Sequence, residues 1–212
     1  MISFNSVSLL KGGKSILGGC TFSVTKGEKV AVTGESGSGK TTILRMIMGA
    51  EVPGGGEIFF RGEKITAANI ASVRSEIAFI GQEPALGAGT IGEALMLPFS
   101  FKSNTRKKPS EERVKSLLNS LKLDEGIETK RCSQVSGGEK QRTAIARAIL
   151  LGKTVFLADE ITSALDKSVV GEVFDLLNKP EYTMISVSHD QEWINRCGRV
   201  LKLELGCIRE VK

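Results

Sequence analysis

A glycine-rich loop between two regular segments constrains the fold of this chain more than any other feature of its sequence. Residues 34–41 read Gly-Glu-Ser-Gly-Ser-Gly-Lys-Thr and match the pattern G-x-x-x-x-G-K-[ST]. The apolar residues 29–33 before the loop predict a short buried strand, and residues 40–48 after it predict a helix that ends at Gly49. A phosphate-binding loop requires this strand–loop–helix context, and a chance Gly-rich turn does not.

In such a loop, backbone N–H groups point inward at phosphate oxygens, and the following helix adds the positive end of its dipole. Lys40 is expected to contact the β- and γ-phosphates of a nucleotide and to assist catalysis there, and the Thr41 hydroxyl is expected to bind Mg²⁺. The residues predicted to hold the phosphates are Gly34, Glu35, Ser36, Gly37, Ser38, Gly39, Lys40, Thr41 and Thr42.

Two carboxylates follow a second apolar run. Residues 154–158 predict a buried strand that leads to Asp159 and Glu160. Because ligands of α/β proteins bind at the carboxyl ends of strands, we expect Asp159 on the Mg²⁺ side and Glu160 as the residue that orients or deprotonates a water. An Asp-Glu pair after a strand is by itself more typical of a helix N-cap. Its combination with the phosphate-binding loop favours the catalytic interpretation.

Two more polar residues follow predicted strands. Residues 76–80 lead to Gln82, and residues 184–188 lead to His189. Taken singly, His189 is more typical of a solvated imidazole and Gln82 of a turn residue. If these strands join one parallel sheet, however, both residues share an edge with Asp159 and the phosphate-binding loop. Gln82 is then predicted to contact Mg²⁺ and nucleotide, and His189 to act in catalysis.

A further set of residues resembles the motifs of ABC-type ATPases. Val135-Ser136-Gly137-Gly138-Glu139 resembles the signature motif of that family, and Ser163-Ala164-Leu165-Asp166 resembles its D-loop. The resemblance implies a head-to-tail homodimer that encloses two ATP molecules, with the phosphate-binding loop of one subunit facing the signature loop of the other. It adds four residues to the expected nucleotide contacts: Ser136, Gly137, Gly138 and Asp166. A P-loop kinase or GTPase has no use for either motif.

The sequence departs from the family pattern at a few positions. The aromatic residue that stacks on adenine in the family is replaced by Leu10 or Lys11, so we expect weak base stacking. Val135 and Glu139 replace the more usual Leu and Gln of the signature motif, and Ile161 replaces the more usual Pro. These changes concern nucleotide affinity and base selectivity, because none of them removes a predicted phosphate or Mg²⁺ contact.

The resemblance covers essentially the whole chain and implies an α/β fold of the P-loop NTPase class, ABC type. Such a fold has a RecA-like mixed sheet core, an N-terminal antiparallel β subdomain and a helical insertion. The sequence agrees, because residues 2–9 and 16–24 predict strands, residues 57–65 predict a hairpin, and Ser110 and Ser136 can each begin a helix. We expect a single ABC ATP-binding domain over residues 1–212, with a core at about 1–85 and 150–212 and a helical subdomain at about 86–149.

Composition indicates the partners and the cellular compartment to expect for this chain. Lys and Arg total 29 against 24 Asp and Glu, a net charge of +5 that is too small and too dispersed to indicate a nucleic-acid surface. The cysteines Cys20, Cys132, Cys197 and Cys207 form no C-x-x-C pair, which favours a reducing compartment. No apolar run approaches the roughly 18 residues of a membrane span, and the start has no signal-peptide pattern. These features predict a cytoplasmic protein.

A membrane partner follows from the resemblance. We expect an ATPase subunit that powers a separate permease and lies at the inner face of the membrane through that permease. Part of the apolar stretch at residues 94–101 is predicted to dock there, with Met96 and Phe99 as the positions to test, and the rest to pack the helical insertion. The alternative is a soluble ABC ATPase that acts on nucleic acid or ribosomes, but such relatives usually carry two fused cassettes or a long coiled coil. Residues 159–166 and Leu97-Pro98-Phe99 are similar to a group of iron-export ATPases.

Overall fold

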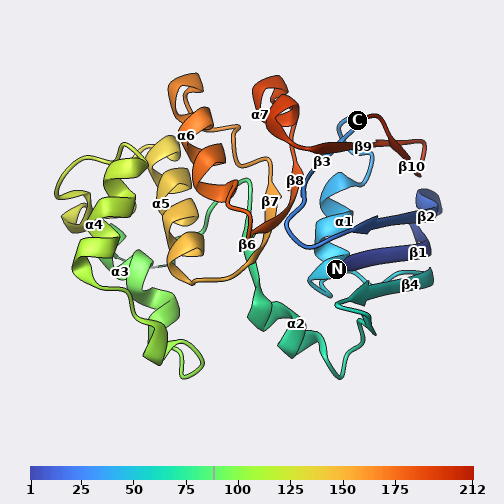
Figure 1. Cartoon of the computed structure of the whole chain (residues 1–212), viewed down its shortest axis with the longest axis horizontal. Helices are drawn as coiled ribbons and strands as arrows, with labels where there is room; N and C mark the ends of the chain where they lie inside the picture. Colours follow the sequence, from blue (N-terminus) through green and yellow to red (C-terminus); the bar gives the residue numbers. More distant parts are fainter. Residues whose placement is uncertain (88) are drawn as a thin grey trace.

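The computed structural model describes residues 1–87 and 89–212, and within them the strands form two sheets (Figure 1). The smaller sheet is antiparallel throughout and confirms the predicted N-terminal β subdomain, including the hairpin that turns at Arg61 and Gly62. Its strands, in spatial order, are β2 (Lys14–Val24), β1 (Ile2–Lys11), β4 (Gly55–Phe60) and β5 (Glu63–Lys64).

The larger sheet is mixed and positions the candidate site. Its strands, in spatial order, are β10 (Cys207–Glu210), β9 (Arg199–Glu204), β3 (Lys29–Thr33), β8 (Thr183–Val187), β7 (Val155–Asp159) and β6 (Ile77–Ile80). All neighbouring pairs from β9 to β6 are parallel, and β10 pairs with β9 in the antiparallel direction. The strands that precede the phosphate-binding loop, Gln82, Asp159 and His189 therefore end at one edge, as predicted.

The helices cover this sheet on both sides. Between β6 and β7 the described elements are all helical, and in Figure 1 they occupy the left half of the molecule, whereas α1 lies on the right beside the antiparallel sheet. The helices are α1 (Lys40–Ile47), α2 (Ile70–Glu76), α3 (Ile91–Met96), α4 (Glu111–Ser120), α5 (Gly137–Leu150), α6 (Lys167–Leu177) and α7 (Gln191–Arg196). Single 3₁₀ turns span Leu97–Ser100, Thr105–Lys107 and Ile127–Thr129.

Local sequence determines where the longer helices begin. The Ser110 side chain accepts a hydrogen bond from the Arg113 N–H and caps α4. At α5 the predicted capping box is complete, because the Ser136 Oγ accepts from the Glu139 N–H and the Glu139 carboxylate accepts from the Ser136 N–H. Each bond satisfies an N–H group that the first helical turn cannot pair.

Some predicted boundaries were wrong. Glu76 is the last residue of α2 and not the first residue of a strand. The apolar stretch at residues 94–101 forms the end of α3 and a 3₁₀ turn in which Leu95 and Phe99 are buried. Phe99 is therefore a core residue and cannot serve as the docking position that the sequence suggested.

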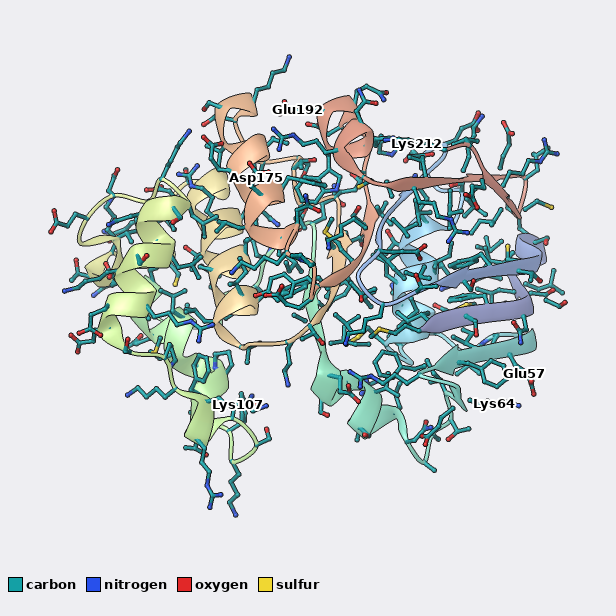
Figure 2. The ribbon with its side chains drawn as sticks, in the orientation of Figure 1. Glu57, Lys64, Lys107, Asp175, Glu192 and Lys212 are labelled. Atoms are coloured by element: carbon teal, nitrogen blue, oxygen red, sulfur yellow. The ribbon has the colours of Figure 1, made fainter. Side chains whose placement is uncertain are left out.

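The side chains of the larger sheet alternate between two hydrophobic clusters, one on each face. Val32 and Leu157 join the cluster that contains α1 and the antiparallel sheet. Ala31 and Phe156, their immediate neighbours in the chain, join the cluster that contains α3 to α7. Charged side chains such as Lys107 and Glu192 lie at the periphery (Figure 2). Both cores thus depend on the same sheet.

The cysteine side chains and the helix lengths are as follows among the described residues. All four cysteines are free, and burial raises the pKa of Cys197 to about 11, so that this thiol is protonated at neutral pH. In the part of the chain that the structure describes, no helix has the length and apolarity needed to cross a membrane.

Candidate active site

The phosphate-binding loop is shaped by glycines that could not carry a side chain. Gly34 and Gly39 have φ values of 144° and 106°, in the region that favours glycine. A Cβ on Gly34 would lie 2.3 Å from the Leu203 carbonyl oxygen, and one on Gly39 would lie 2.7 Å from the Ile16 side chain. The loop therefore packs closely against β9 and β2, and only glycine fits at these two positions.

Lys40 is buried at the base of this loop. Its Nζ donates to the carbonyl oxygens of Gly34 at 2.9 Å and Glu35 at 2.7 Å. These two bonds link the ammonium group to the start of the loop. Burial lowers the pKa of Lys40, and the carboxylates of Glu160 and Asp159 partly oppose that shift. The sequence predicted the position of this lysine but not its bonds to the loop's own carbonyl groups.

Thr41 and Asp159 meet at the start of α1. The Thr41 Oγ1 donates to the Asp159 Oδ1 at 3.0 Å, which brings together two of the three residues predicted to bind Mg²⁺. Burial raises the pKa of Asp159, as does the adjacent Glu160, whereas the Thr41 hydroxyl and Lys40 lower it. A buried carboxylate paired with a hydroxyl is an all-oxygen donor set of the kind that Mg²⁺ prefers.

Glu160 lies between the other two strand-end residues. Its Oε2 accepts from Gln82 Nε2 at 3.3 Å, and its Oε1 lies 3.6 Å from His189 Nε2. The φ of Glu160 is 47°, and its N–H donates to the Val187 carbonyl oxygen at 2.9 Å. Side chains from the ends of β6, β7 and β8 thus converge, as expected from the parallel sheet.

The motif residues at Ser136–Gly138 and Asp166 lie elsewhere on the surface. Ser136 and Gly137 are exposed at the start of α5, and Asp166 is exposed at the start of α6, where its side chain makes no capping bond. Gly138 is required by close packing, because a Cβ there would lie 2.8 Å from the Ala164 carbonyl oxygen. In Figure 1, α5 and α1 stand on opposite sides of the strands β6 to β8. One chain therefore does not bring its signature loop to its own phosphate-binding loop.

Two polar residues of α5 for which the sequence predicted no role connect this helix to the site. Gln141 is fully buried and donates to the Gly81 carbonyl oxygen at 3.2 Å, next to Gln82. Arg147 donates to the carbonyl oxygens of Leu86 at 3.1 Å and Ala85 at 3.2 Å. A polar residue on the otherwise apolar face of α5 was the available signal for Gln141. Both bonds hold the segment that follows β6 against α5.

The inner side of the phosphate-binding loop fits a triphosphate. The Ser38 Oγ is buried and has no hydrogen-bond partner among the described residues. No side chain caps the N-terminus of α1, so its first N–H groups remain available as donors. A buried orphan hydroxyl and uncapped N–H groups around a lysine form a site for phosphate oxygens.

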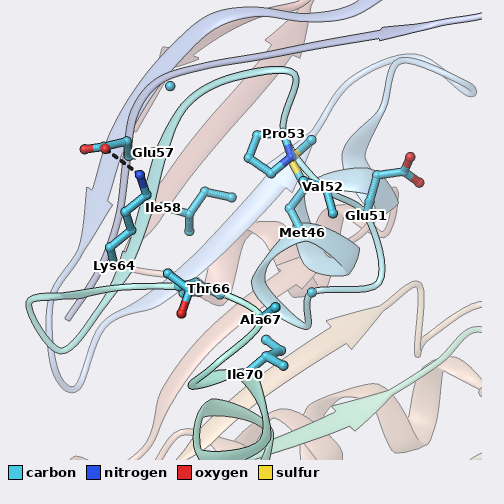
Figure 3. Close-up of a pocket in the computed structure, with 13 residues that line it drawn as sticks. Met46, Glu51, Val52, Pro53, Glu57, Ile58, Lys64, Thr66, Ala67 and Ile70 are labelled. Carbon is cyan, nitrogen blue, oxygen red and sulfur yellow. Dashed lines mark hydrogen bonds and ion pairs between the residues drawn. The ribbon is translucent and has the colours of Figure 1, made fainter.

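A second hollow, of about 250 Å³, lies away from these residues (Figure 3). Apolar side chains of α1, β4 and α2 line it, among them Met46, Ile58 and Ile70, and the Glu57–Lys64 ion pair lies at its rim. None of the predicted site residues contributes to its wall. The hollow therefore has no part in the chemistry of the strand ends.

Comparison with known proteins gives the family. A sequence model described as "ABC transporter" matches residues 17–163, which include the phosphate-binding loop, the signature motif and Glu160. The chain belongs to the ABC transporter family. It is 30% identical over 208 residues to the probable iron export ATP-binding protein FetA of Escherichia coli, covering 96% of this chain and 91% of FetA. FetA is of the iron-export kind that the sequence resembles.

Other family members with comparable identity are longer. The chain is 34% identical to a putative peptide import ATP-binding protein of Brucella ovis and spans 65% of its length. It is also 34% identical to the methionine import ATP-binding protein MetN of Caulobacter vibrioides and spans 66% of that protein. The chain thus spans about two thirds of the length of these two import proteins.

Solved structures confirm the fold. The ATP-binding cassette MJ0796, solved as a dimer in a post-hydrolysis state with ADP and Pi, superposes with a TM-score of 0.86 at 29% identity over 100% of this chain and 98% of that one. A bacterial Atm1-family ABC exporter with ATP bound gives the same TM-score at 28% identity, over 99% of this chain and 38% of the exporter. The chain is an α/β ABC cassette that binds and hydrolyses ATP.

Proposed function

We propose that this chain drives a separate membrane permease and that it works as a head-to-tail dimer enclosing two ATP molecules. The observation that carries this proposal is the division of the expected nucleotide contacts between two surfaces of one chain. Thr41, Asp159 and Glu160 lie together at the strand ends, whereas Ser136 and Gly137 are exposed on the far side of β6 to β8. A second copy of the chain would supply the signature loop that each site lacks.

The residues then divide the work. The loop N–H groups and Lys40 bind the β- and γ-phosphates, and Thr41, Asp159 and Gln82 would hold Mg²⁺, which neutralises phosphate charge when bound. Glu160 takes a proton from the attacking water or orients it, because its carboxylate is held between Gln82 and His189 at the same edge. His189 contributes a ring nitrogen on the γ-phosphate side.

A nucleotide-dependent dimer tests this arrangement. Glu160→Gln should slow hydrolysis by about 10²- to 10⁴-fold, and with Mg²⁺ and ATP it should form a dimer by size exclusion with light scattering. Gly137→Asp in the same background should prevent the dimer. It should leave nucleotide affinity of the monomer unchanged by titration calorimetry, because that loop does not contact its own site. Gly137 is suited to this test because the nearest atom to an added Cβ lies 4.0 Å away.

The control is Glu63→Gln, an exposed carboxylate outside the site. It should hydrolyse ATP at the wild-type rate and show no trapped dimer. A Gly137→Asp, Glu160→Gln double variant that still dimerises with ATP would contradict the head-to-tail arrangement. A Glu160→Gln variant that turns over at the wild-type rate would remove Glu160 from catalysis.

The permease is proposed to dock in a groove beside β6. Phe79 on β6 is 43% exposed, and it lines a hollow of about 330 Å³ together with Ala85, Ala148 and Leu151. The groove adjoins Gln82 and the Arg147-bound segment, so docking there would be coupled to the nucleotide site. We expect Phe79→Asp to keep the ATPase of the isolated chain and to prevent co-purification with the permease. Val52→Asp, at an exposed apolar residue elsewhere, is the control.

We propose that the permease, and not this chain, selects the transported substrate. Relatives at 30–34% identity are named for iron export, peptide import and methionine import. Similar cassettes therefore accompany different cargoes and directions, which favours a shared ATPase role for this chain.

A further inference from the structure

The loop between α3 and α4 carries basic side chains that form no ion pair with the residues that the structure describes. The stretch at residues 94–110 contains Lys102, Arg106, Lys107 and Lys108 and no Asp or Glu. All four basic side chains are exposed, and none of them forms an ion pair with another of the described residues. Lys108 lines a hollow that is also lined by Glu111 and Glu128, whereas the other three basic residues do not line it. In Figure 2, Lys107 lies at the outer end of the helical part of the molecule.

Apolar side chains are exposed in the same loop. Phe101 is 59% exposed and Leu97 is 36% exposed, although Phe99 between them is buried. The loop is not loose at this point, because Asn104 donates to the Pro98 carbonyl oxygen at 3.0 Å and its N–H donates to the Phe101 carbonyl oxygen at 2.9 Å. An ordered backbone therefore holds an aromatic ring out in solvent among cations.

This surface borders the groove proposed for the permease. Leu97 packs on the segment after β6, since its Cδ2 lies 3.6 Å from the place of a Cβ on Gly87. Lys153 lies two residues after Leu151, which lines the groove. Burial is the larger cause of the lowered pKa of Lys153, and the charge of nearby Lys107 lowers that pKa further. We name as the basic tip Leu97, Phe101, Lys102, Arg106 and Lys107.

We propose that the basic tip binds the anionic headgroups of a lipid bilayer, with Phe101 entering the headgroup region. Charge complementarity favours this occupant: Lys102, Arg106 and Lys107 are exposed cations of one loop that form no ion pair with the described residues, and they match a surface of like negative charges. Exposed aromatic rings beside Lys and Arg are typical of segments that lie in a membrane interface. The proposal goes beyond the ATPase role, and it concerns the chain itself in the absence of a permease and nucleotide.

Vesicle binding of the full chain without nucleotide tests the proposal. Wild type should sediment with vesicles of phosphatidylcholine containing about one third phosphatidylglycerol, at least tenfold more tightly than with pure phosphatidylcholine. Raising NaCl to about 0.5 M should release it, because surface charge is then screened within a few ångströms. Each cation lost from such a surface reduces binding about fivefold, so Lys102→Glu with Lys107→Glu should reduce it at least 25-fold.

The matched control is Lys14→Glu with Arg209→Glu. Both control residues are exposed, and they lie on β2 and β10 at the opposite side of the molecule (Figure 1). Each pair of substitutions changes the net charge from +5 to +1, so a general charge effect would affect both equally. Phe101→Ser should weaken binding several-fold, and Leu205→Ser, at a side chain that is 97% exposed, should not. All these variants should keep the wild-type ATPase rate.

Three outcomes would overturn the basic tip as a lipid contact. The first is equal binding of wild type to neutral and anionic vesicles, and the second is equal loss in the tip and control pairs. The third is a tip pair that binds vesicles like wild type but fails to co-purify with the permease, since the tip would then contact protein. None of these measurements depends on nucleotide or dimer, so failure of the proposed ATPase mechanism would leave this test intact.

Discussion

Asp159 and Glu160 are adjacent in the chain, but their carboxylates have different surroundings. Asp159 ends β7, is buried, and accepts from Thr41, whereas Glu160 is half-buried between Gln82 and His189. The left-handed backbone of Glu160, which L-residues rarely adopt, separates the two side chains. The sequence predicted both residues at the strand end. It could not predict this backbone conformation, which depends on the bond to Val187 of the neighbouring strand.

Replacing Asp159 by Asn should stabilise the nucleotide-free protein at neutral pH. Burial raises the pKa of Asp159 above its unfolded value, so the folded state binds the proton more strongly. The contribution of Asp159 to the free energy of unfolding of the wild type is therefore fully present below the pKa of the unfolded state. It is lost as the pH rises through the pKa of the folded state. Asn carries no charge to bury and retains an oxygen that accepts from Thr41.

Calorimetry at two pH values measures the effect. We expect Asp159→Asn to raise Tm by a few degrees at pH 7 and to match wild type below about pH 4, while losing the Mg²⁺-dependent part of ATP affinity. Asp175→Asn, at an exposed carboxylate that pairs with Arg196, is the control and should show no such gain. A lower Tm for Asp159→Asn at pH 7 would contradict the cost assigned to this buried charge.

At the scale of elements, α5 carries both the signature loop and the bonds to the segment after β6. The capping box and the apolar face of α5 were predictable, because both depend on residues three or four positions apart. The bonds of Gln141 and Arg147 were not, since their acceptors are backbone carbonyl groups about 60 residues away. Helices α2, α3 and α7 were also missed, because six or seven residues give less than two full turns of periodicity. Their formation depends on packing in the folded chain.

Arg147→Lys should loosen the segment after β6 without removing charge. The guanidinium donates to two neighbouring carbonyl groups, and an ammonium cannot reproduce that fork. Losing one charged hydrogen bond costs about 1.5–3 kcal/mol. We expect a lower Tm, faster amide hydrogen exchange at residues 81–87, and a reduced ATPase rate.

The control for this substitution is Arg113→Lys on the exposed side of α4, which should leave stability and exchange unchanged. If residues 81–87 of Arg147→Lys exchanged as slowly as in wild type, these bonds would not hold the segment. That result would also weaken the coupling between docking groove and nucleotide site, because Gln82 and the groove share this segment.

At the scale of the whole molecule, one sheet serves two hydrophobic clusters. The phosphate-binding loop and α1 belong to the cluster on one face, and the signature helix α5 belongs to the cluster on the other. A sheet with other elements packed on both of its faces was predictable from the alternation of strands and helices. Which face each helix covers was not, because strand order and crossover direction are set by the full topology and not by any one segment.

Leu157→Ala should test whether the two clusters unfold together. Leu157 is fully buried in the cluster with α1, whereas Trp193, the single tryptophan of the chain, is fully buried in the other cluster, edge-on to Phe174. A buried Leu→Ala change costs about 2–5 kcal/mol. Because β7 and its neighbours belong to both cores, we expect one unfolding transition. The Trp193 fluorescence and the far-UV circular dichroism should therefore report the same decrease in the free energy of unfolding and coincident midpoints. Val52→Ala, at a 77% exposed side chain, should change neither midpoint. If the Trp193 transition stayed at the wild-type midpoint while the circular dichroism midpoint shifted, the two faces of the sheet would unfold separately. The nucleotide surface and the signature surface would then not be rigidly joined through the sheet.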